Sequence, residues 1–357
     1  MTTQKDWPAS ATDVSTEQTY RPQIDGLRAI AMIGVLFVHF WDDKPVIEYV
    51  RVTLFFVVSG FLITHILIAA RESGKRLQIG NFYVRRALRL FPALWLALTV
   101  AWVFDADNIR DNFLWHVLPT SNIYFAFNEK FEPWVLAHIW SLNLLEQFYL
   151  FWPVVVLLLP RSGVLIVAVL VYAALVFVQA NIVPLGITSW WGDLVLSGDP
   201  IYVGALTCVL MREAGPRRVL ASRWMLPPAM IVILSPLLLW DGFGHSQSYR
   251  IVSTFAVALV VAGAYQGYPG PLGRLLESGA ARFVSKISYG VYVYHLLLWY
   301  IVGQVFPDIF AKDATTFAVM SGVTVAVAIL SWYAIEAPVN RLRRHFPTAT
   351  AAADQAR

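Results

Sequence analysis

The sequence contains very little cysteine and little charge. Of its 357 residues, one is a cysteine and 14% are charged, whereas soluble domains carry about 25% charged residues. A single cysteine can form neither a disulfide within the chain nor a cysteine-rich metal site. We interpret Cys208, which lies in an apolar segment, as a small buried hydrophobic residue. The low charge content argues against an ordinary soluble globular protein.

Motifs of several enzyme and transporter classes are also missing. The sequence has no Gly-x-Ser-x-Gly elbow of a serine hydrolase and no glycine-rich phosphate loop. Its histidines and carboxylates show no metal-ligand spacing, so we expect no bound metal. No internal repeat is visible, which removes support for a transporter built from inverted repeats.

Long apolar segments dominate what is present. Hydrophobic residues make up 58% of the chain, in runs of the 17 to 25 residues or so that a helix needs to cross a bilayer. We therefore predict an all-α polytopic membrane protein with about ten transmembrane helices. The seventh is the weakest, because Pro227, Pro228 and Pro236 predict kinks. The predicted spans are 24–41, 50–70, 84–104, 139–159, 163–183, 194–212, 225–240, 250–268, 286–305 and 314–335.

The distribution of positive charge predicts the orientation of these spans. With both termini in the cytoplasm, most arginines fall in cytoplasmic segments, whereas the opposite loops hold few basic residues, among them Lys44, Arg51 and Lys130. The net charge of +4 follows this topology, so we expect no nucleic-acid partner. Residues 1–20 lack the features of a signal peptide and are predicted to be a disordered cytoplasmic tail. The transmembrane domain covers 21–340, and residues 341–357 form a basic, then disordered tail.

The first span carries two ionisable side chains, Arg28 and His39. They are 11 residues apart, roughly 16 Å along a helix. Ionisable groups within a span are costly and are therefore functional candidates. Asp25 lies three residues before Arg28 and can pair with it across one helical turn. The alternative is that Arg28 reaches the cytoplasmic headgroups and His39 lies in the outer interface.

The fourth span begins with polar residues of similar interest. Glu146 lies about 10 Å below the outer end of its span, at the depth predicted for His39. We therefore predict a His39–Glu146 pair in which the carboxylate orients the imidazole. The alternative is a structural hydrogen bond of Glu146 between helices. His138 lies at the mouth of the same span.

Two further clusters suggest ligand contacts. Arg85, Arg86 and Arg89 lie close together at the cytoplasmic start of the third span. Their guanidinium groups would bind the phosphates of a ligand or anionic lipid headgroups, or would only set the membrane topology. In the ninth span, Ser288, Tyr292 and His295 share one helical face. This face lines either a cavity or a structural hydrogen-bond network. The outer loop 105–138 is rich in aromatic residues, typical of a lid over the outer mouth or of an interfacial belt.

Together these segments resemble acyltransferase family 3, whose members are integral-membrane acyltransferases of carbohydrates and other acceptors. The resemblance covers about residues 20–345 and keeps its order along the chain. The matching motifs are Tyr20-Arg-Pro-Gln-Ile-Asp25-Gly26-Leu27-Arg28 with His39, Leu54-Phe-Phe-Val-Val-Ser59-Gly60-Phe61-Leu62-Ile63-Thr64, Phe82-Tyr-Val-Arg85-Arg86 with Arg89 and Pro92, His138-x-Trp140-Ser141-Leu142 with Glu146, Phe148 and Tyr149, Ser288-Tyr289-Gly290 with His295, and Glu336-x-Pro338.

The resemblance implies a chemistry and a location. It implies a bacterial inner-membrane enzyme with an acyl-CoA donor, usually acetyl-CoA, on the cytoplasmic side. The acceptor would be a hydroxyl of a surface glycan or its lipid-linked precursor, presented outside or in the outer leaflet. The catalytic candidates are His39, Glu146 and Arg28; the donor-site candidates are Arg85, Arg86, Arg89, Ser288, Tyr289 and His295; the acceptor-site candidates are His138, Trp140, Tyr149 and Trp134.

Two other functions remain open from the sequence. A transporter or flippase for an anionic or glycosylated lipid would use the same basic entrance and polar interior. An acyltransferase could also act on a macrolide-type small molecule. The missing repeats count against the transporter.

Overall fold

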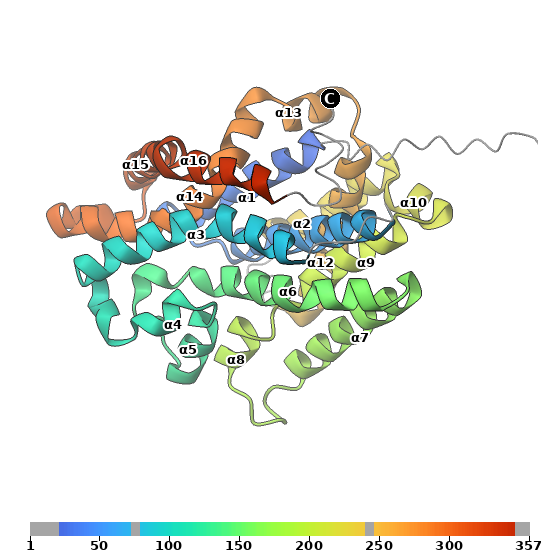
Figure 1. Cartoon of the computed structure of the whole chain (residues 1–357), viewed down its shortest axis with the longest axis horizontal. Coiled ribbons are helices and arrows are strands. Elements are labelled where there is room, and N and C mark those ends of the chain that lie inside the picture. Colours follow the sequence, from blue (N-terminus) through green and yellow to red (C-terminus); the bar gives the residue numbers. More distant parts are fainter. Residues whose placement is uncertain (1–20, 73–78, 240–245, 347–357) are drawn as a thin grey trace, which may run out of the picture.

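The computed structural model describes residues 21–72, 79–239 and 246–346, and every regular element in these ranges is a helix. The prediction of an all-α protein is therefore confirmed (Figure 1). Residues 1–20 and 347–357 of the predicted tails lie outside the described residues. The long helices are α1 (Pro22–Phe40), α2 (Pro45–Glu72), α3 (Ile79–Val103), α6 (Ile139–Leu158), α7 (Arg161–Ala180), α9 (Asp199–Leu210), α11 (Leu226–Leu239), α12 (Gln247–Gln266), α14 (Gly279–Val305) and α15 (Ala314–Ser331).

Helices occur at all ten predicted spans. Eight helices in the described part of the chain are long and apolar enough to cross a membrane. The bent helix pair Ala214–Leu220 and Arg223–Leu237 would add a ninth span if it counts as one. This bent pair contains the proline-rich span that the sequence marks as weakest. The sixth span combines α9 with the short α8 (Ser189–Leu194). The predicted ninth span lies in α14, which has 27 residues but is not among these eight helices. The protein is a multi-pass membrane protein.

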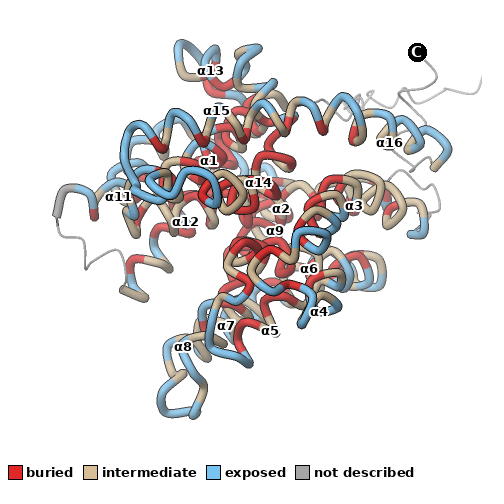
Figure 2. The backbone as a smooth tube through the Cα atoms, turned by 90° about the vertical axis from the view of Figure 1, so that its left-hand side faces the viewer, coloured by how far each residue is buried: buried red, intermediate tan, exposed pale blue. Residues whose placement is uncertain are grey.

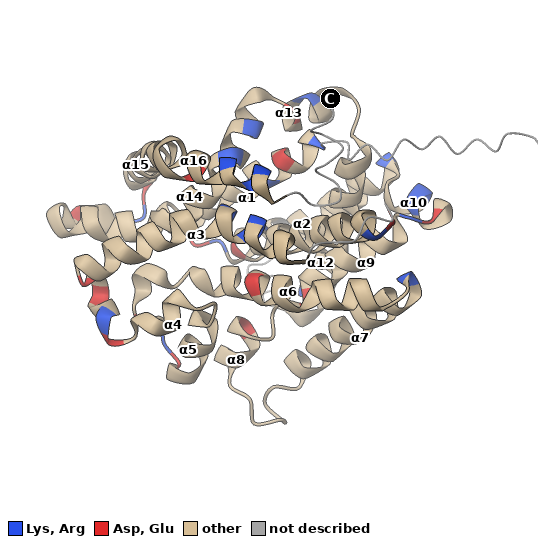
Figure 3. Cartoon of the chain, in the orientation of Figure 1, with Lys and Arg blue, Asp and Glu red and all other residues tan. Residues whose placement is uncertain are grey.

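The two ends of the bundle differ in charge (Figure 3). We call the end that holds Arg85, Arg161 and Arg217 the basic end, and the end that holds residues 104–138 the opposite end. Two short helices, α10 (Ala214–Leu220) and α13 (Gly270–Leu276), connect spans at the basic end. The predicted orientation places the basic end in the cytoplasm.

Helix α2 lies at the centre of the bundle, and its buried residues continue those of α1, α9 and α14 (Figure 2). α2 and α9 approach so closely that neither helix has room for a side chain at the contact. A Cβ added to Gly60 would lie 1.9 Å from the carbonyl oxygen of Ile201, and one added to Gly204 would lie 2.2 Å from that of Val57. Small residues allow such contacts between membrane helices.

A buried glutamine fixes the start of α1. The side chain of Gln23, 3% exposed, donates to the carbonyl of Tyr268 and to Glu277, at 3.0 and 2.8 Å, and accepts from the backbone N–H of Tyr268 at 2.7 Å. The side-chain amide of Gln23 both donates and accepts hydrogen bonds. This polar group is therefore buried with its hydrogen-bonding atoms satisfied. The contact holds α1 to the connection between α12 and α13.

The aromatic segment at the opposite end is folded. It forms η1 (Ala106–Asp111), α4 (Phe113–Val117), α5 (Ser121–Asn128) and η2 (Trp134–Leu136). The side chain of Asn122 donates to the carbonyl of Leu194, and its backbone N–H donates to the side chain of Asn143, both at 3.2 Å. These bonds fix α5 to α6 and α8, so the segment covers these helices.

A buried histidine links α4 to α5. The ring of His116, 1% exposed, contacts Ser121 through Nδ1 at 3.0 Å and Asn112 through Nε2 at 3.1 Å. Burial lowers the pKa of His116 to about 4. The ring is therefore neutral in the folded segment at neutral pH.

The glycine contact predicts a loss of stability when either glycine is enlarged. Gly204→Ala forces the backbones of α2 and α9 apart, and we expect it to lower the free energy of unfolding by about 1–3 kcal/mol. Thermal unfolding of the purified protein in detergent measures the change. Gly322→Ala in α15 is the matched control, because nothing lies within 4 Å of its added Cβ. Equal unfolding temperatures for the two variants would contradict this account of the contact.

The burial of His116 predicts that acid loosens the α4–α5 segment. An opened segment protonates His116 below its ordinary pKa of about 6.5, whereas the folded segment resists protonation down to about 4. Stability is therefore lost as pH falls through this window, by up to about 2 kcal/mol at pH 5. Hydrogen exchange of residues 113–128, corrected for the intrinsic rate, measures it. His116→Gln should remove the pH dependence; if it persists, another group titrates.

Candidate active site

A central cavity of about 180 Å³ runs between α1, α2, α3, α6 and α14. Three arginines line it towards the basic end: Arg28, Arg86 and Arg89. Arg51, Ser141 and Tyr292 line it towards the opposite end. Apolar side chains lie between these groups, among them Phe55, Leu62, Ile66, Leu90 and Leu145. The cavity therefore has a cationic end, an apolar middle and a polar far end.

The predicted pair of Asp25 and Arg28 is present. Nη1 of Arg28 lies 3.7 Å from the carboxylate of Asp25, which accepts a 2.9 Å hydrogen bond from Ser285. Nη2 of Arg28 donates to Ser288 at 3.4 Å. Arg28 thus faces the cavity from α1 and is held by α14 as well as by its own helix.

The three arginines of α3 do not share one environment. Arg86 lies over the ring of Tyr149, 4.9 Å from its centroid, and lines the cavity with Arg89. Arg85 instead donates to the backbone carbonyls of Arg343 and Phe346, at 2.9 and 3.3 Å. Arg85 does not line this cavity and holds the C-terminal segment after α16 (Ala337–Arg341). A ligand contact of all three arginines stays a prediction.

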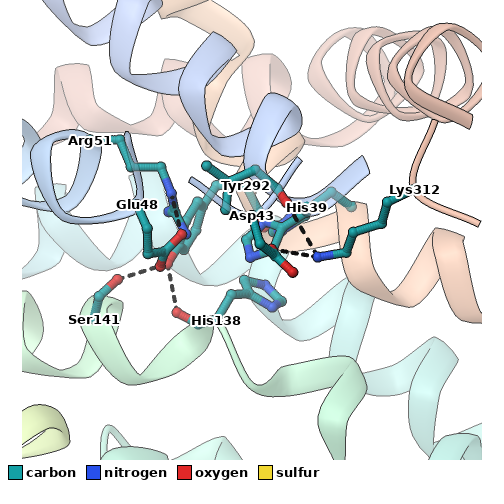
Figure 4. Close-up of polar contacts among 10 residues, drawn as sticks. His39, Asp43, Glu48, Arg51, His138, Ser141, Tyr292 and Lys312 are labelled. Carbon is teal, nitrogen blue, oxygen red and sulfur yellow. Dashed lines mark hydrogen bonds and ion pairs between the residues drawn. The ribbon is translucent and has the colours of Figure 1, made fainter. Parts of the chain in front are cut away.

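Three histidines meet beyond the far end of the cavity: His39 of α1, His138 just before α6 and His295 of α14. Figure 4 shows His39 and His138 near Tyr292. Nδ1 of His39 lies 2.8 Å from Nε2 of His295, and the ring centroids of His138 and His295 are 4.6 Å apart. His295 is fully buried and His138 is 4% exposed. Among the described residues, these rings form no metal-holding group.

The hydrogen bonds of His295 decide how His39 is protonated. Nδ1 of His295 lies 2.6 Å from the backbone carbonyl of Tyr292, which can only accept, so this nitrogen carries the proton. In the neutral ring, Nε2 of His295 is then an acceptor, and Nδ1 of His39 must donate to it. His39 is left with an unprotonated Nε2. The geometry therefore gives His39 the tautomer of a general base.

The predicted pairing of His39 with Glu146 is not found, because His295 occupies that place. The nearest polar contact of Glu146 is Asn143, which donates to Oε2 at 3.5 Å. Oε1 of Glu146 and the hydroxyl of Tyr289 are buried without a hydrogen-bond partner in the described part of the chain. The two residues belong to α6 and α14, and Tyr289 lines the cavity.

Tyr292 connects the cavity to the histidines. Its hydroxyl lies 2.7 Å from the hydroxyl of Ser141 and donates to the backbone carbonyl of His138 at 2.6 Å. The ring of Tyr292 is 5.1 Å from that of His138. Neither ring nitrogen of His138 has a hydrogen-bond partner of normal geometry among the described residues, although the carbonyl of Val293 interacts with the ring.

Sequence reasoning missed Arg51. It was assigned to an outer loop, but α2 begins at Pro45, five residues before the predicted span. Arg51 is therefore within the helix, 5% exposed, and lines the far end of the cavity. Its guanidinium donates to Glu48 through Nε at 2.9 Å and through Nη2 (Figure 4). Proline is favoured in the first turn of a helix, so Pro45 is the sequence signal that places Arg51 inside α2.

The predicted acceptor residues are dispersed. Trp134 packs among Trp299, Tyr300 and Phe310, whereas Tyr149 lies under Arg86 towards the basic end. Of the four candidates, Trp134, His138 and Trp140 lie at the opposite end. Trp140 packs edge-on against Phe56.

Known proteins are similar to this chain over the residues that form the cavity and the histidine cluster. Residues 21–335 match the family described as an acyltransferase domain. A peptidoglycan O-acetyltransferase of Listeria monocytogenes, OatA, is 28% identical over 90% of this chain and 56% of its own length. YrhL of Bacillus subtilis, whose name carries a provisional peptidoglycan O-acetyltransferase assignment, is 29% identical over 90% of this chain and 55% of its own. No solved structure matches.

This chain spans little more than half the length of these relatives. The match covers the helical bundle, including α1, the cavity and the histidines.

The Arg51–Glu48 pair predicts that the stability of the fold depends on the carboxylate of Glu48. Glu48→Gln leaves the buried guanidinium without its anion, and we expect the free energy of unfolding to fall by about 1–3 kcal/mol. Glu132→Gln is the matched control, because Glu132 pairs with Lys130 at an exposed position. Thermal unfolding of both variants in detergent measures the difference. If Glu48→Gln unfolds like the control, the pair does not stabilise the buried arginine.

Proposed function

This chain belongs to acyltransferase family 3, and we propose that it transfers an acetyl group from cytoplasmic acetyl-CoA to a hydroxyl of a surface glycan or its lipid-linked precursor. The observation that carries the proposal is a neutral His39, with a free Nε2, beyond the end of a cavity that begins with three arginines. The bacterial inner membrane is the proposed location.

The distribution of charged and apolar groups along the cavity suits acetyl-CoA, which would supply the activated thioester. Its phosphates are anionic, and Arg28, Arg86 and Arg89 line the cationic end; guanidinium groups bind phosphate oxygens well. The apolar middle suits the narrow, mostly uncharged arm that joins the nucleotide to the thioester. Ser288 and Tyr289 line the same cavity and add hydroxyl groups to it.

At the far end, the residues have separate roles in transfer. Nε2 of His39 removes the proton of the acceptor hydroxyl, whose oxygen attacks the thioester carbonyl carbon. The carbon–sulfur bond then breaks, and the thiolate takes the proton back from His39. Arg51 lines this end of the cavity and can donate to the oxyanion that forms on the carbonyl oxygen. His295 is a positioning residue, since it orients His39.

Two details of this mechanism follow from the contacts. Tyr292 lines the cavity and contacts the imidazole of His295. Movement of its side chain would therefore open the cavity towards the histidines. Transfer through an acetyl-histidine also suits the residues. We favour direct transfer, because both substrates then meet in one place without an intermediate exposed to water.

A transfer assay tests the proposal. Purified protein is incubated with radiolabelled acetyl-CoA and envelope glycans, and label in the glycan fraction is measured for wild type, His39→Ala and His345→Ala. We expect His39→Ala to lower the rate 10²–10⁴-fold, the usual contribution of a general base, with donor binding retained. His345 is exposed at the basic end, so its variant should resemble wild type.

The other outcomes are equally informative. Equal labelling by wild type and His39→Ala would remove His39 from the mechanism. A folded wild-type protein that neither binds nor consumes acetyl-CoA would overturn the acyltransferase proposal and favour a lipid transporter. Label on a small hydrophobic alcohol rather than a glycan would overturn the acceptor class.

A further inference from the structure

We propose that a second cavity, at the opposite end of the bundle, binds the acceptor as a chain of neutral sugar rings. This inference rests on the proposed function and names where its second substrate lies. The second cavity has a volume of about 680 Å³, within the range of about 300–1,000 Å³ that is usual for small-molecule sites. Residues of α2, α6, α8, α9 and α12 line it, together with Phe131.

Aromatic side chains supply the first argument for sugars. Tyr49, Phe131, Trp140 and Trp190 all line the second cavity. Aromatic rings with a polar edge combine a broad apolar face with a hydrogen-bonding group. A pyranose ring has the complementary surface, because its C–H groups form an apolar face and its hydroxyls lie around the edge.

The charged groups supply the second argument. Arg250 lies 3.4 Å from Asp193, and Glu48 is paired with Arg51. Each charge that lines the cavity is thus opposed by another, so the site has no strong field of one sign. Such a site suits the hydroxyls of a neutral ligand, which both donate and accept hydrogen bonds. A phosphate or a polycation would instead require an excess of one charge.

The position of the second cavity supplies the third argument. Val52 and Phe56 line both cavities, and they are one helical turn apart on α2. Glu48 lines the second cavity, while its partner Arg51 lines the first. A sugar bound against Glu48 therefore contacts the ion-pair partner of Arg51, the residue proposed to stabilise the oxyanion.

Adjacent tryptophans on α8 provide a matched test. Trp190 lines the second cavity and packs against Phe131, with the ring centroids 5.0 Å apart. Trp191 does not line this cavity and packs edge-on against Phe127 at 4.8 Å. The two residues have the same chemistry and the same helix but different neighbours.

The experiment measures acetyl transfer from radiolabelled acetyl-CoA to two soluble probes, N-acetylchitotetraose and maltotetraose. Wild type, Trp190→Ala, Trp190→Phe and Trp191→Ala are compared. We expect Trp190→Ala to raise the KM for at least one probe about tenfold, equivalent to about 1.4 kcal/mol. The KM for acetyl-CoA and its slow hydrolysis without sugar should stay unchanged. Trp190→Phe should recover most of the affinity, and Trp191→Ala should resemble wild type.

The readouts separate this inference from the proposed function. Failure of wild type to bind or hydrolyse acetyl-CoA would contradict the proposed function, while equilibrium dialysis of radiolabelled probe without donor still tests the second cavity. If wild type consumes acetyl-CoA but neither probe binds or is acetylated, the sugar assignment is overturned. It is also overturned if Trp190→Ala and Trp191→Ala change the KM for sugar equally.

Discussion

The backbone contact between α2 and α9 at Gly60 and Gly204 determines where α2 lies, and both cavities depend on α2. Successive turns of this helix carry Arg51, Val52 and Phe56 to the region where the cavities adjoin. In the Ser59-Gly60-Phe61 segment, Ser59 lines the first cavity. The glycine of this segment lets α2 press against α9, and that contact directs the neighbouring side chains inward. A structural requirement and the geometry of the site are met by the same few residues.

Several polar groups of the bundle are held in pairs that span different helices. Arg28 joins α1 to α14, Asn122 joins α5 to α8, and His39 joins α1 to α14 a second time. In an apolar surrounding, an unpaired polar group is costly, so each pair also fixes the helices that supply it. The imidazole of His39 is oriented by another imidazole and, through it, by a backbone carbonyl. No carboxylate is needed, and the neutral base does not bring a charge into the membrane.

Local features of this fold were predictable and contacts between distant helices were not. Length and apolarity located the helices, and the spacing of three residues correctly predicted the pair of Asp25 and Arg28. The pairing of His39 with Glu146 rested on equal depth alone. Depth does not fix the rotation of a helix about its axis, and the rotation of α14 brings His295 to His39 instead. The sequence also did not show that Arg85 donates to the backbone after α16 while Arg86 and Arg89 line the cavity. Arg51 was missed because α2 begins earlier than its apolar run.

The wall that Val52 and Phe56 form between the two cavities has a consequence for the membrane itself. An enzyme that takes one substrate from each side must let both approach a common point without opening a leak for protons or ions. With one substrate in each cavity, the barrier that a bilayer spreads over about 30 Å would be reduced to a layer of side chains. Most of the potential across the membrane would then fall over this layer. Two apolar residues on one helix would have to keep it closed to water while leaving the substrates within reach of each other.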